Sequence, residues 1–287
     1  MRIAEIHRYP VKSMLGEHLR EADLTEQGIA GDRAWALRDE VRGSLTGAKR
    51  FPALMSMAAR FAEEPDVDNL SPEVRIRHAG GELSSRSGNV DGHLSEVLGH
   101  PVSLWPLLPA DNLDHYRRTA APEGTDMESA LRALFGRTED EPLPDVSRFP
   151  ETLASHETPP GTYFDAYPLL IMTRASLAAL ADAAARAGMT SVFDMRRFRP
   201  NLVVDTAEEG FVENAWIGRT LRIGAAVVKV EMECPRCIMT THGFADLPRD
   251  PKIMRALVQH NGGNLGVYAS VSNGAAIREG DDAELID

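Results

Sequence analysis

Two cysteines lie three positions apart, and the chain contains no others. Cys234 and Cys237 belong to the motif Cys-Pro-Arg-Cys, which follows a run of alternating hydrophobic residues. Thiolates bind soft metals and attack electrophiles, and a guanidinium beside the second sulfur, that of Arg236, would favour the thiolate form. In a reducing compartment such a pair is more often catalytic or metal-binding than a structural disulfide.

Three other interpretations of the cysteine pair stay open at this point. A structural zinc site needs four ligands, and the nearby histidines, His242 and His260, do not complete a known finger spacing. A thioredoxin-like dithiol needs a helix directly after the motif, whereas we expect residues 238–241 to be extended. Two buried thiols that act as small core residues would need no ligand. The spacing alone does not choose among these interpretations.

Basic residues gather at two further places in the chain. Residues 196–201 read Arg-Arg-Phe-Arg-Pro-Asn, and guanidinium groups bind phosphate through paired hydrogen bonds. Lys12 and Ser13 end the first expected strand, and Arg33 follows in the sequence Gly-Asp-Arg. If the first hairpin brings these side chains together, they form an anion pocket. Taken singly, each cluster is equally consistent with solvated surface charge.

Short alternating segments predict a strand-rich N-terminal region. The expected strands span residues 3–9, 19–24, 34–38, 74–84 (a hairpin turning at 78–81) and 102–105. One brief helix is expected over residues 91–98, ended by Gly99. Strands this short and closely spaced are typical of a small barrel, which we assign to residues 1–108.

The middle of the chain differs from both flanks. Residues 109–160 hold seven of the eighteen prolines together with acidic patches, which disfavours regular structure. We expect a connecting segment or lid that contains one helix, around residues 127–135.

Residues 161–287 are expected to form a second β-rich unit with helices packed outside. Thr173 should cap a helix that stops at Gly188, and Asp250 with Pro251 should open another. The expected strands span residues 202–204, 221–223, 226–232, 265–271 and 283–286.

Composition excludes several classes of function. The 43 acidic and 31 basic residues give a net charge of -12, so the overall field repels nucleic acids and anionic membranes. The N-terminus shows no charged-then-apolar secretion signal, and no apolar run is long enough to cross a bilayer. We therefore expect a cytoplasmic protein that binds neither nucleic acid nor membrane.

Four segments, in this order, resemble the MOSC-domain family, which includes the mitochondrial amidoxime-reducing components. The segments are Tyr9-Pro10-Val11-Lys12-Ser13, Gly31-Asp32-Arg33, Phe198-Arg199-Pro200-Asn201 and Cys234-Pro235-Arg236-Cys237-Ile238-Met239-Thr240-Thr241. The resemblance covers residues 1–108 and 161–287 and leaves the proline-rich middle without a match. It implies an α+β, β-rich fold with an N-terminal β-barrel domain, followed by a MOSC β-barrel domain with peripheral helices.

The same resemblance implies a molybdenum cofactor, with molybdopterin held between the two domains and Cys237 as the metal ligand and catalytic residue. The other side chains that it places at the cofactor are Lys12, Ser13, Arg33, Arg199, Asn201, Arg236 and Tyr268. Family contacts also fall near Ala166 and Tyr167, where the residues differ. Cys234 would then be the structural member of the pair.

The function that the resemblance implies is a molybdenum-dependent oxidoreductase. It would remove oxygen from small N-hydroxylated compounds (amidoximes, hydroxylamines or N-hydroxylated bases) in a two-electron reduction. Two cysteines cannot supply the four thiolates of a plant-type iron-sulfur cluster, so a separate ferredoxin, flavoprotein or haem protein would deliver electrons. A non-catalytic carrier of sulfur or molybdenum cofactor would use the same cysteine, and a cofactor-free thiol oxidoreductase would need both cysteines.

Overall fold

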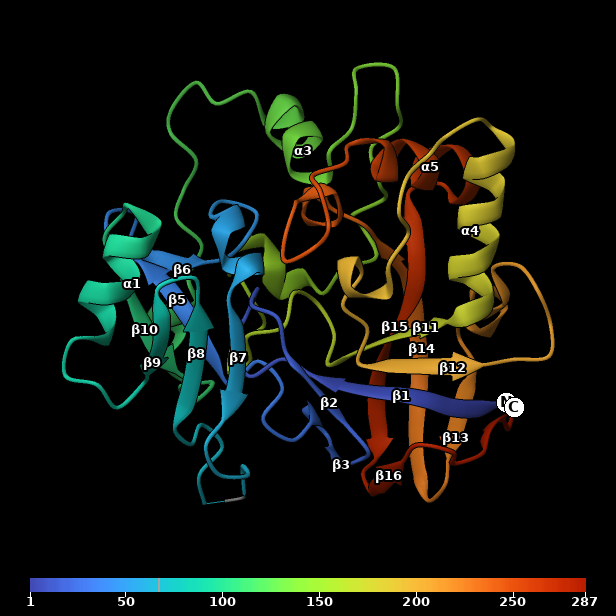
Figure 1. The fold of residues 1–287 in the computed structure, drawn as a ribbon, viewed down its shortest axis with the longest axis horizontal. Helices are drawn as coiled ribbons and strands as arrows, with labels where there is room; N and C mark the ends of the chain where they lie inside the picture. Colours follow the sequence, from blue (N-terminus) through green and yellow to red (C-terminus); the bar gives the residue numbers. More distant parts are fainter. Residues whose placement is uncertain (67) are drawn as a thin grey trace.

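An eight-stranded sheet dominates the C-terminal part of the computed structural model, which describes residues 1–66 and 68–287 (Figure 1). Its strand order is β17-β13-β14-β15-β11-β12-β1-β2. These strands span Ala283–Leu285, Thr220–Ile223, Ala226–Pro235, Asn264–Asn273, Leu169–Thr173, Leu202–Asp205, Arg2–Arg8 and Glu17–Leu19. The pairings are antiparallel except that β11 and β12 run parallel.

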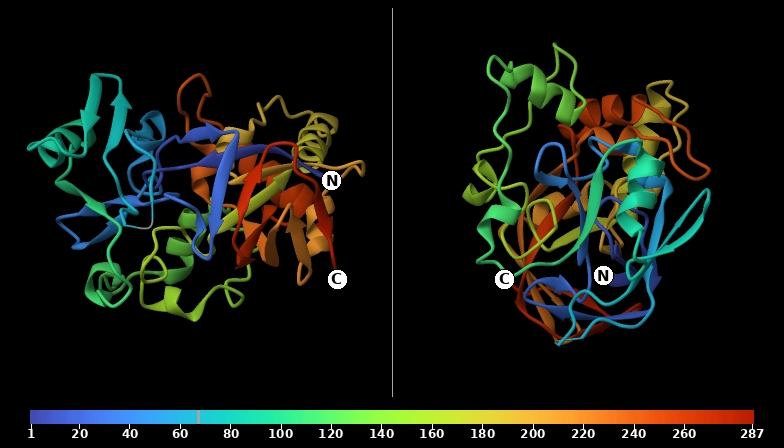
Figure 2. Two further views of the ribbon diagram at one scale, coloured as in Figure 1. Left: turned by 90° about the horizontal axis from the view of Figure 1, so that it is seen from below. Right: turned by 90° about the vertical axis from the view of Figure 1, so that its left-hand side faces the viewer.

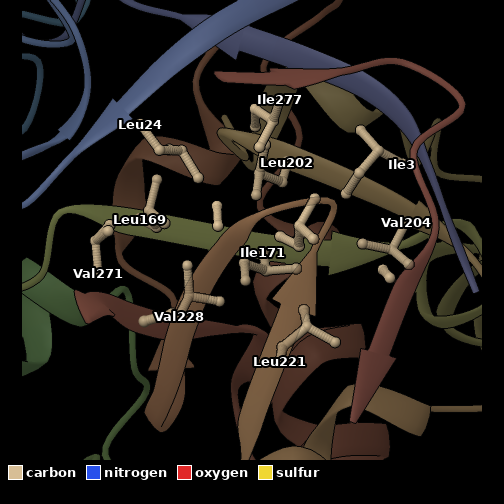
Figure 3. Packing of buried hydrophobic residues seen from close by; sticks show 14 of the residues in the cluster. Ile3, Leu24, Leu169, Ile171, Leu202, Val204, Leu221, Val228, Val271 and Ile277 are labelled. Carbon is tan, nitrogen blue, oxygen red and sulfur yellow. The ribbon is translucent and has the colours of Figure 1, made fainter. Parts of the chain in front are cut away.

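The first strand lies in this C-terminal sheet, which corrects our assignment of residues 3–9 to an N-terminal barrel. β1 pairs with β12, with Ile6 opposite Leu202. Its inward side chains, Ile3 and Ile6, join the apolar cluster on one face of the sheet, which also contains Leu169 and Val204 (Figure 3). Alternation in the sequence predicts a strand and its buried face, but it does not name the partner strand.

Short sheets make up the rest of the strand structure. One has the order β10-β5-β6, a second β7-β8-β9, and a third β16-β3-β4, in which a C-terminal strand pairs with N-terminal ones. The strands span Val102–Pro106, Trp35–Asp39, Ser44–Thr46, Ala58–Phe61, Val74–His78, Gly81–Ser84, Ala276–Arg278, Glu21–Thr25 and Gly28–Ile29. The expected strand over 19–24 is therefore two strands, β2 and β3, in different sheets.

The described residues confirm the α+β, strand-rich fold, but none of their sheets closes into the barrels that we expected for residues 1–108 and 161–287. The eight-stranded sheet comes nearest to closure. β2 pairs with the second half of β1, and Ile3 at its other end donates from its N to the Asp281 carbonyl at 2.9 Å. A single bridge, Arg2 to Asp282, follows. In the N-terminal unit, η1 (Pro52–Ser56) separates β6 from β7, which places them in different sheets.

Helices cover the outer face of the large sheet. The main ones are α4 (Arg174–Arg186) and α5 (Lys252–Asn261), and both were expected. Thr173 Oγ1 accepts from the Ser176 N at 3.0 Å and caps α4. Beneath α4 and α5 lies a second apolar cluster, which includes Phe198. The remaining helical segments are α1 (Val90–Leu98), α2 (Leu113–Tyr116), η2 (Glu151–Ala154), η3 (Met195–Arg197), η4 (Val212–Trp216) and η5 (Ile238–Thr241).

The middle segment contains the expected helix, α3 (Met127–Phe135), with Asp126 as its N-cap and Gly136 in the left-handed conformation at its end. α3 lies beside α5 in Figure 1 and in the right-hand view of Figure 2. The two chain ends overlap in the view of Figure 1 but stand apart in both views of Figure 2; near them, the Ala283 N donates to the Met1 carbonyl at 2.9 Å. None of the described helices has the length and hydrophobicity that a membrane crossing needs.

Candidate functional site

A cavity of about 530 Å³ lies between the N-terminal and C-terminal parts of the chain, within the size range of ligand-binding sites. All eight predicted site residues line it: Lys12, Ser13, Arg33, Arg199, Asn201, Arg236, Cys237 and Tyr268. The structure therefore brings together side chains that are up to 256 positions apart in the sequence. The role of each residue stays a prediction.

Cys237 stands at the start of a single helical turn. It is the N-cap of η5, which corrects our expectation that residues 238–241 are extended. The two threonines explain the turn, because Thr240 Oγ1 donates to the Cys237 carbonyl at 3.1 Å and Thr241 Oγ1 to the Ile238 carbonyl at 2.7 Å. Cys237 is partly exposed and lines the cavity, so its sulfur is accessible to a ligand.

Arg236 contacts the first sulfur, not the second as the sequence had led us to expect. Its Nη1 donates to Cys234 Sγ at 2.9 Å, and its Nη2 donates to the Phe198 carbonyl. Extended backbone places side chains two apart on the same face, which brings Arg236 beneath Cys234. Burial raises the pKa of the Cys234 thiol, and Arg236 only partly opposes this. Cys234 is thus an enclosed thiol, whereas Cys237 is the available one.

The three arginines of the cluster at 196–201 have different surroundings. Arg196 is surface-exposed and pairs with Asp194 and Asp246. Arg197 is buried and donates to backbone carbonyls, among them that of His242 at 2.9 Å, so it fixes the loop after η5. Arg199 faces the cavity. Arg197 also lines the cavity, but its guanidinium is taken up by backbone carbonyls, whereas Arg199 keeps a nitrogen without a partner. Arg199 therefore has the placement of a ligand-binding group, as does Arg236, which follows β14.

Tyr9 supports two of the cavity's guanidinium groups. The Cζ of Arg199 lies 4.2 Å from the centre of the Tyr9 ring, and that of Arg33 lies 5.1 Å away. Arg199 Nη1 also donates to the Met14 carbonyl. Burial lowers the pKa of Arg199 to about 10, and the nearby Tyr9 phenol and Asp32 carboxylate oppose this shift only in part. A buried cation with so little compensation favours an anionic ligand.

Three of the predicted site residues have left-handed backbone. Ser13 has φ 72°, Arg33 φ 52° and Arg199 φ 55°, and the described residues contain only one other non-glycine residue with positive φ, Ala245. This conformation costs a residue other than glycine about 1–2 kcal/mol. Three such residues line the same cavity, which indicates that the placement of their side chains there outweighs the local cost to the backbone.

Sequence reasoning missed a pair of side chains, Lys49 and Asp165. Asp165 Oδ1 accepts from Lys12 Nζ at 2.6 Å, and its Oδ2 lies 3.8 Å from Lys49 Nζ. Burial alone would raise the pKa of Asp165, but the two lysines and Arg33 hold it far below its usual value. Asp165, and more weakly Cys237, raise the pKa of Lys49 although burial opposes this, so Lys49 stays a cation in the cavity that Cys237 also lines. Neither residue lies in a motif, so no sequence signal pointed to them.

Asn201 and Tyr268 have different surroundings in the cavity wall. The Asn201 amide is engaged with the backbone: its Oδ1 accepts from Leu170 N at 3.2 Å, and its Nδ2 donates to the His7 carbonyl at 3.3 Å. It therefore ties together β11, β12 and β1. Burial, together with Cys234 and Asp165, raises the pKa of Tyr268 well above its usual value, so its phenol stays protonated. The Tyr268 ring lies 5.6 Å from that of Tyr167, which also lines the cavity.

The described residues contain no group of three or more His, Cys, Asp or Glu side chains that could hold a metal. His242 instead has its Nε2 3.1 Å from the Ala48 carbonyl. Both cysteines are free thiols. A protein-only zinc site therefore finds no support in these residues, whereas a metal that arrives with its own organic ligand would need only one sulfur.

Comparison with known families matches residues 1–98 to the MOSC N-terminal beta barrel domain and residues 158–284 to the MOSC domain. The chain is a MOSC-domain protein. The MOSC family is associated with the molybdenum cofactor. The motifs quoted above thus identified the family correctly.

Curated relatives of this MOSC protein are distant. It is 29% identical over 249 residues to human mitochondrial amidoxime reducing component 2, which covers 83% of this chain and 66% of that protein. It is 24% identical over 318 residues to mouse mitochondrial amidoxime-reducing component 1, with 99% and 82% covered. The chain thus spans slightly less than two thirds of the human relative.

Solved structures show weaker likeness. The YuaD protein from Bacillus subtilis has a TM-score of 0.45 at 13% identity, over 99% of this chain and 94% of that one. YiiM from Geobacillus stearothermophilus has a TM-score of 0.31 at 20% identity, over 42% and 55%.

The residues of this MOSC protein fit a molybdopterin cofactor. Arg199 Nη2 and Arg236 Nε are buried without a hydrogen-bond partner in the protein, and both side chains line the cavity. Such orphaned cationic donors are costly unless a ligand satisfies them. Phosphate suits them, and Cys237 supplies a soft sulfur ligand close by. We call the cationic lining formed by Lys12, Arg33, Lys49, Arg199 and Arg236 the basic wall.

Proposed function

We propose that this chain binds a molybdenum cofactor through Cys237 and reduces N-hydroxylated compounds such as amidoximes, hydroxylamines or N-hydroxylated bases. The main support for the proposal is that the partly exposed Cys237 and the basic wall line the same cavity. The name of the relatives, amidoxime reducing components, supports the substrate class.

The chain's own residues would hold the cofactor from both sides. Cys237 would bind the metal as a thiolate, with the cationic Lys49 in the same cavity lining. Arg199 and Arg236 would donate to the phosphate through the nitrogen atoms that now lack a partner. Because Tyr9 and the Met14 carbonyl already fix the Arg199 guanidinium, little side-chain entropy is lost on binding.

When bound, the cofactor would supply the two-electron chemistry that removes oxygen from nitrogen. The chain would contribute a shielded cavity and a fixed set of polar groups. Asp165 and Tyr268 both line the cavity. Their pKa shifts keep Asp165 as a carboxylate and Tyr268 as a neutral phenol. A substrate N–OH group could therefore donate to Asp165 and accept from Tyr268, which would orient it.

Electrons would come from a separate protein. The two cysteines of these 287 residues cannot form a four-thiolate iron-sulfur cluster, and one of them is assigned to the metal. We propose a ferredoxin, a flavoprotein or a haem protein as the donor. Turnover by this chain with NADH alone would contradict this part of the proposal.

The direct test is an assay of purified, cofactor-loaded protein with benzamidoxime and reduced methyl viologen. We expect formation of benzamidine, measured by chromatography, with molybdenum retained after many turnovers. Absence of turnover with benzamidoxime, hydroxylamine and an N-hydroxylated base, in protein shown to contain molybdenum, would refute the activity. Transfer of the metal or of sulfur to an acceptor enzyme during the assay would indicate a carrier instead.

A further inference from the structure

The middle segment supplies a distinct part of the cavity lining. Between residues 131 and 154 it contributes a set of large hydrophobic side chains, which we call the apolar wall: Leu131, Leu134, Phe135, Phe149 and Leu153. The first three lie at positions i, i+3 and i+4 of α3, which places them on one face of the helix. The apolar wall is thus separate in sequence from the basic wall.

The side chains of the apolar wall do not pack into a hydrophobic core cluster. None of its five residues belongs to an apolar cluster of the described residues, either as a buried member or as a partly buried neighbour. Leu131, Leu134, Phe149 and Leu153 stay partly exposed although they are large and hydrophobic. A helix normally turns its apolar face toward a core, whereas this one turns it toward the cavity.

Specific contacts fix this segment in place. Arg137, directly after α3, is buried and donates from Nη1 to Met254 Sδ at 3.0 Å. A side chain at position 263 would displace this guanidinium, and the left-handed backbone there (φ 85°) also favours glycine. Arg255 of α5 donates to the Gly136 carbonyl and pairs with Glu141. These anchors hold the apolar wall as a fixed surface in the cavity.

The helix that carries most of the apolar wall lies against the turn that Cys237 opens. A Cβ added to Gly136 would lie 3.0 Å from the Cδ1 of Ile238, the residue that follows Cys237. α3 accordingly contacts η5, the turn that Cys237 opens. A molecule that approaches the sulfur from this side would have its remaining groups against the apolar wall.

We propose that the apolar wall is a substrate-binding subsite that selects N-hydroxylated compounds carrying an aromatic or bulky aliphatic group. This inference rests on the proposed function and names the substrate class of the same site. The basic wall takes the anionic part of the cofactor, and phosphate gains nothing from leucine or phenylalanine side chains. The substrate's hydrocarbon part is the group that gains by leaving water for this surface.

Steady-state kinetics with paired substrates test the subsite. Cofactor-loaded wild type, Leu134→Ser and Phe149→Ser would be assayed with benzamidoxime and with acetamidoxime, which lacks the ring. The matched control is Met127→Ser, also on α3, because Met127 is 58% exposed and does not line the cavity. We expect wild type to have a higher kcat/KM for benzamidoxime than for acetamidoxime. In each of the two wall variants, the ratio of these two kcat/KM values should fall roughly tenfold. The control should keep the wild-type ratio.

A binding measurement separates failure of the subsite from failure of the proposed activity. Benzamidine and acetamidine, which carry no N–OH group, would be titrated into the same proteins by calorimetry. We expect benzamidine to bind wild type about tenfold more tightly than acetamidine, and Leu134→Ser to abolish the difference.

Each outcome decides one question. Turnover of both amidoximes without preference, or a preference that survives in both wall variants, would overturn the subsite and leave the reductase intact. If no N-hydroxylated compound reacts, the proposed activity fails, and the calorimetry alone then decides whether the apolar wall binds an aromatic group.

Discussion

The two walls of the cavity are built in different ways. The basic wall comes from the ends of strands in the large sheet and from loops tied to it, and two of its arginines are buried, Arg199 at 7% and Arg236 at 8% exposure. The apolar wall comes from the middle segment, and its side chains lie outside every core cluster of the described residues; all but the buried Phe135 are partly exposed.

This difference indicates which side chains of the site can be substituted without destabilising the fold. Altering the basic wall disturbs buried hydrogen bonds that also hold the structure together, such as that from Arg236 to the Phe198 carbonyl. Altering the apolar wall removes side chains on which no core depends. We therefore expect cofactor binding to be coupled to stability, and substrate preference to be largely uncoupled from it.

The largest expected effect concerns the two cysteines. Cys237→Ser should lose nearly all bound molybdenum, because a serine hydroxyl is a hard and weakly acidic ligand. Cys234→Ser should keep most of it, because Cys234 is an enclosed thiol bonded to Arg236. Elemental analysis of both variants, expressed in the same host as wild type, gives the metal content. Equal loss in both variants would contradict this assignment and favour a dithiol site.

A second prediction compares the stabilities of the two walls. Arg236→Ala leaves the Phe198 carbonyl without its donor and should lower the free energy of unfolding by about 1–3 kcal/mol. Leu134→Ser should change it by no more than about 0.5 kcal/mol, because the side chain is partly exposed. Urea unfolding of the cofactor-free proteins measures both values. A loss for Leu134→Ser as large as that for Arg236→Ala would erase the contrast between the walls.

The smallest expected effect is a pH dependence at Asp165. Its folded-state pKa is depressed: burial opposes ionisation, but Lys12 and Lys49 outweigh it. The ion pairs therefore contribute stability above the unfolded-state value of about 3.9, and this contribution is lost as the pH falls toward the folded-state pKa. The difference in melting temperature between wild type and Asp165→Asn should be constant from about pH 7 to 5 and shrink below about pH 4.

The control for this measurement is Asp182→Asn on α4, where the carboxylate is exposed and has no assigned role. It should show little difference from wild type at any pH. A difference between wild type and Asp165→Asn that grows on acidification would contradict the assigned direction.

Local patterns decided several parts of this protein before any tertiary structure was known. Helix α3 spans residues 127–135 as expected, and Thr173 caps α4 as expected, because caps and helical periodicity act over a few neighbouring residues. The four motifs also identified the family, which the matches to both MOSC domains confirm although the human relative is only 29% identical.

Pairing partners were decided only by the tertiary structure. β1 lies in the C-terminal sheet, and β11 (Leu169–Thr173), an entirely buried strand at its centre, was not expected at all. A continuous apolar run carries no period that separates a buried strand from a helix segment. Sheet closure likewise depends on which distant strands meet, and the described sheets stay open.

The chemistry of the site divides in the same way. The sequence by itself determined that this chain has one motif with the sulfur a metal needs and basic motifs suited to a phosphate. Only the tertiary structure decided that Arg236 contacts Cys234, that Lys49 and Asp165 enter the cavity, and that α3 turns its apolar face inward. The physical reason is that residue type is a local property, whereas charge pairing and burial depend on contacts between residues far apart in the chain.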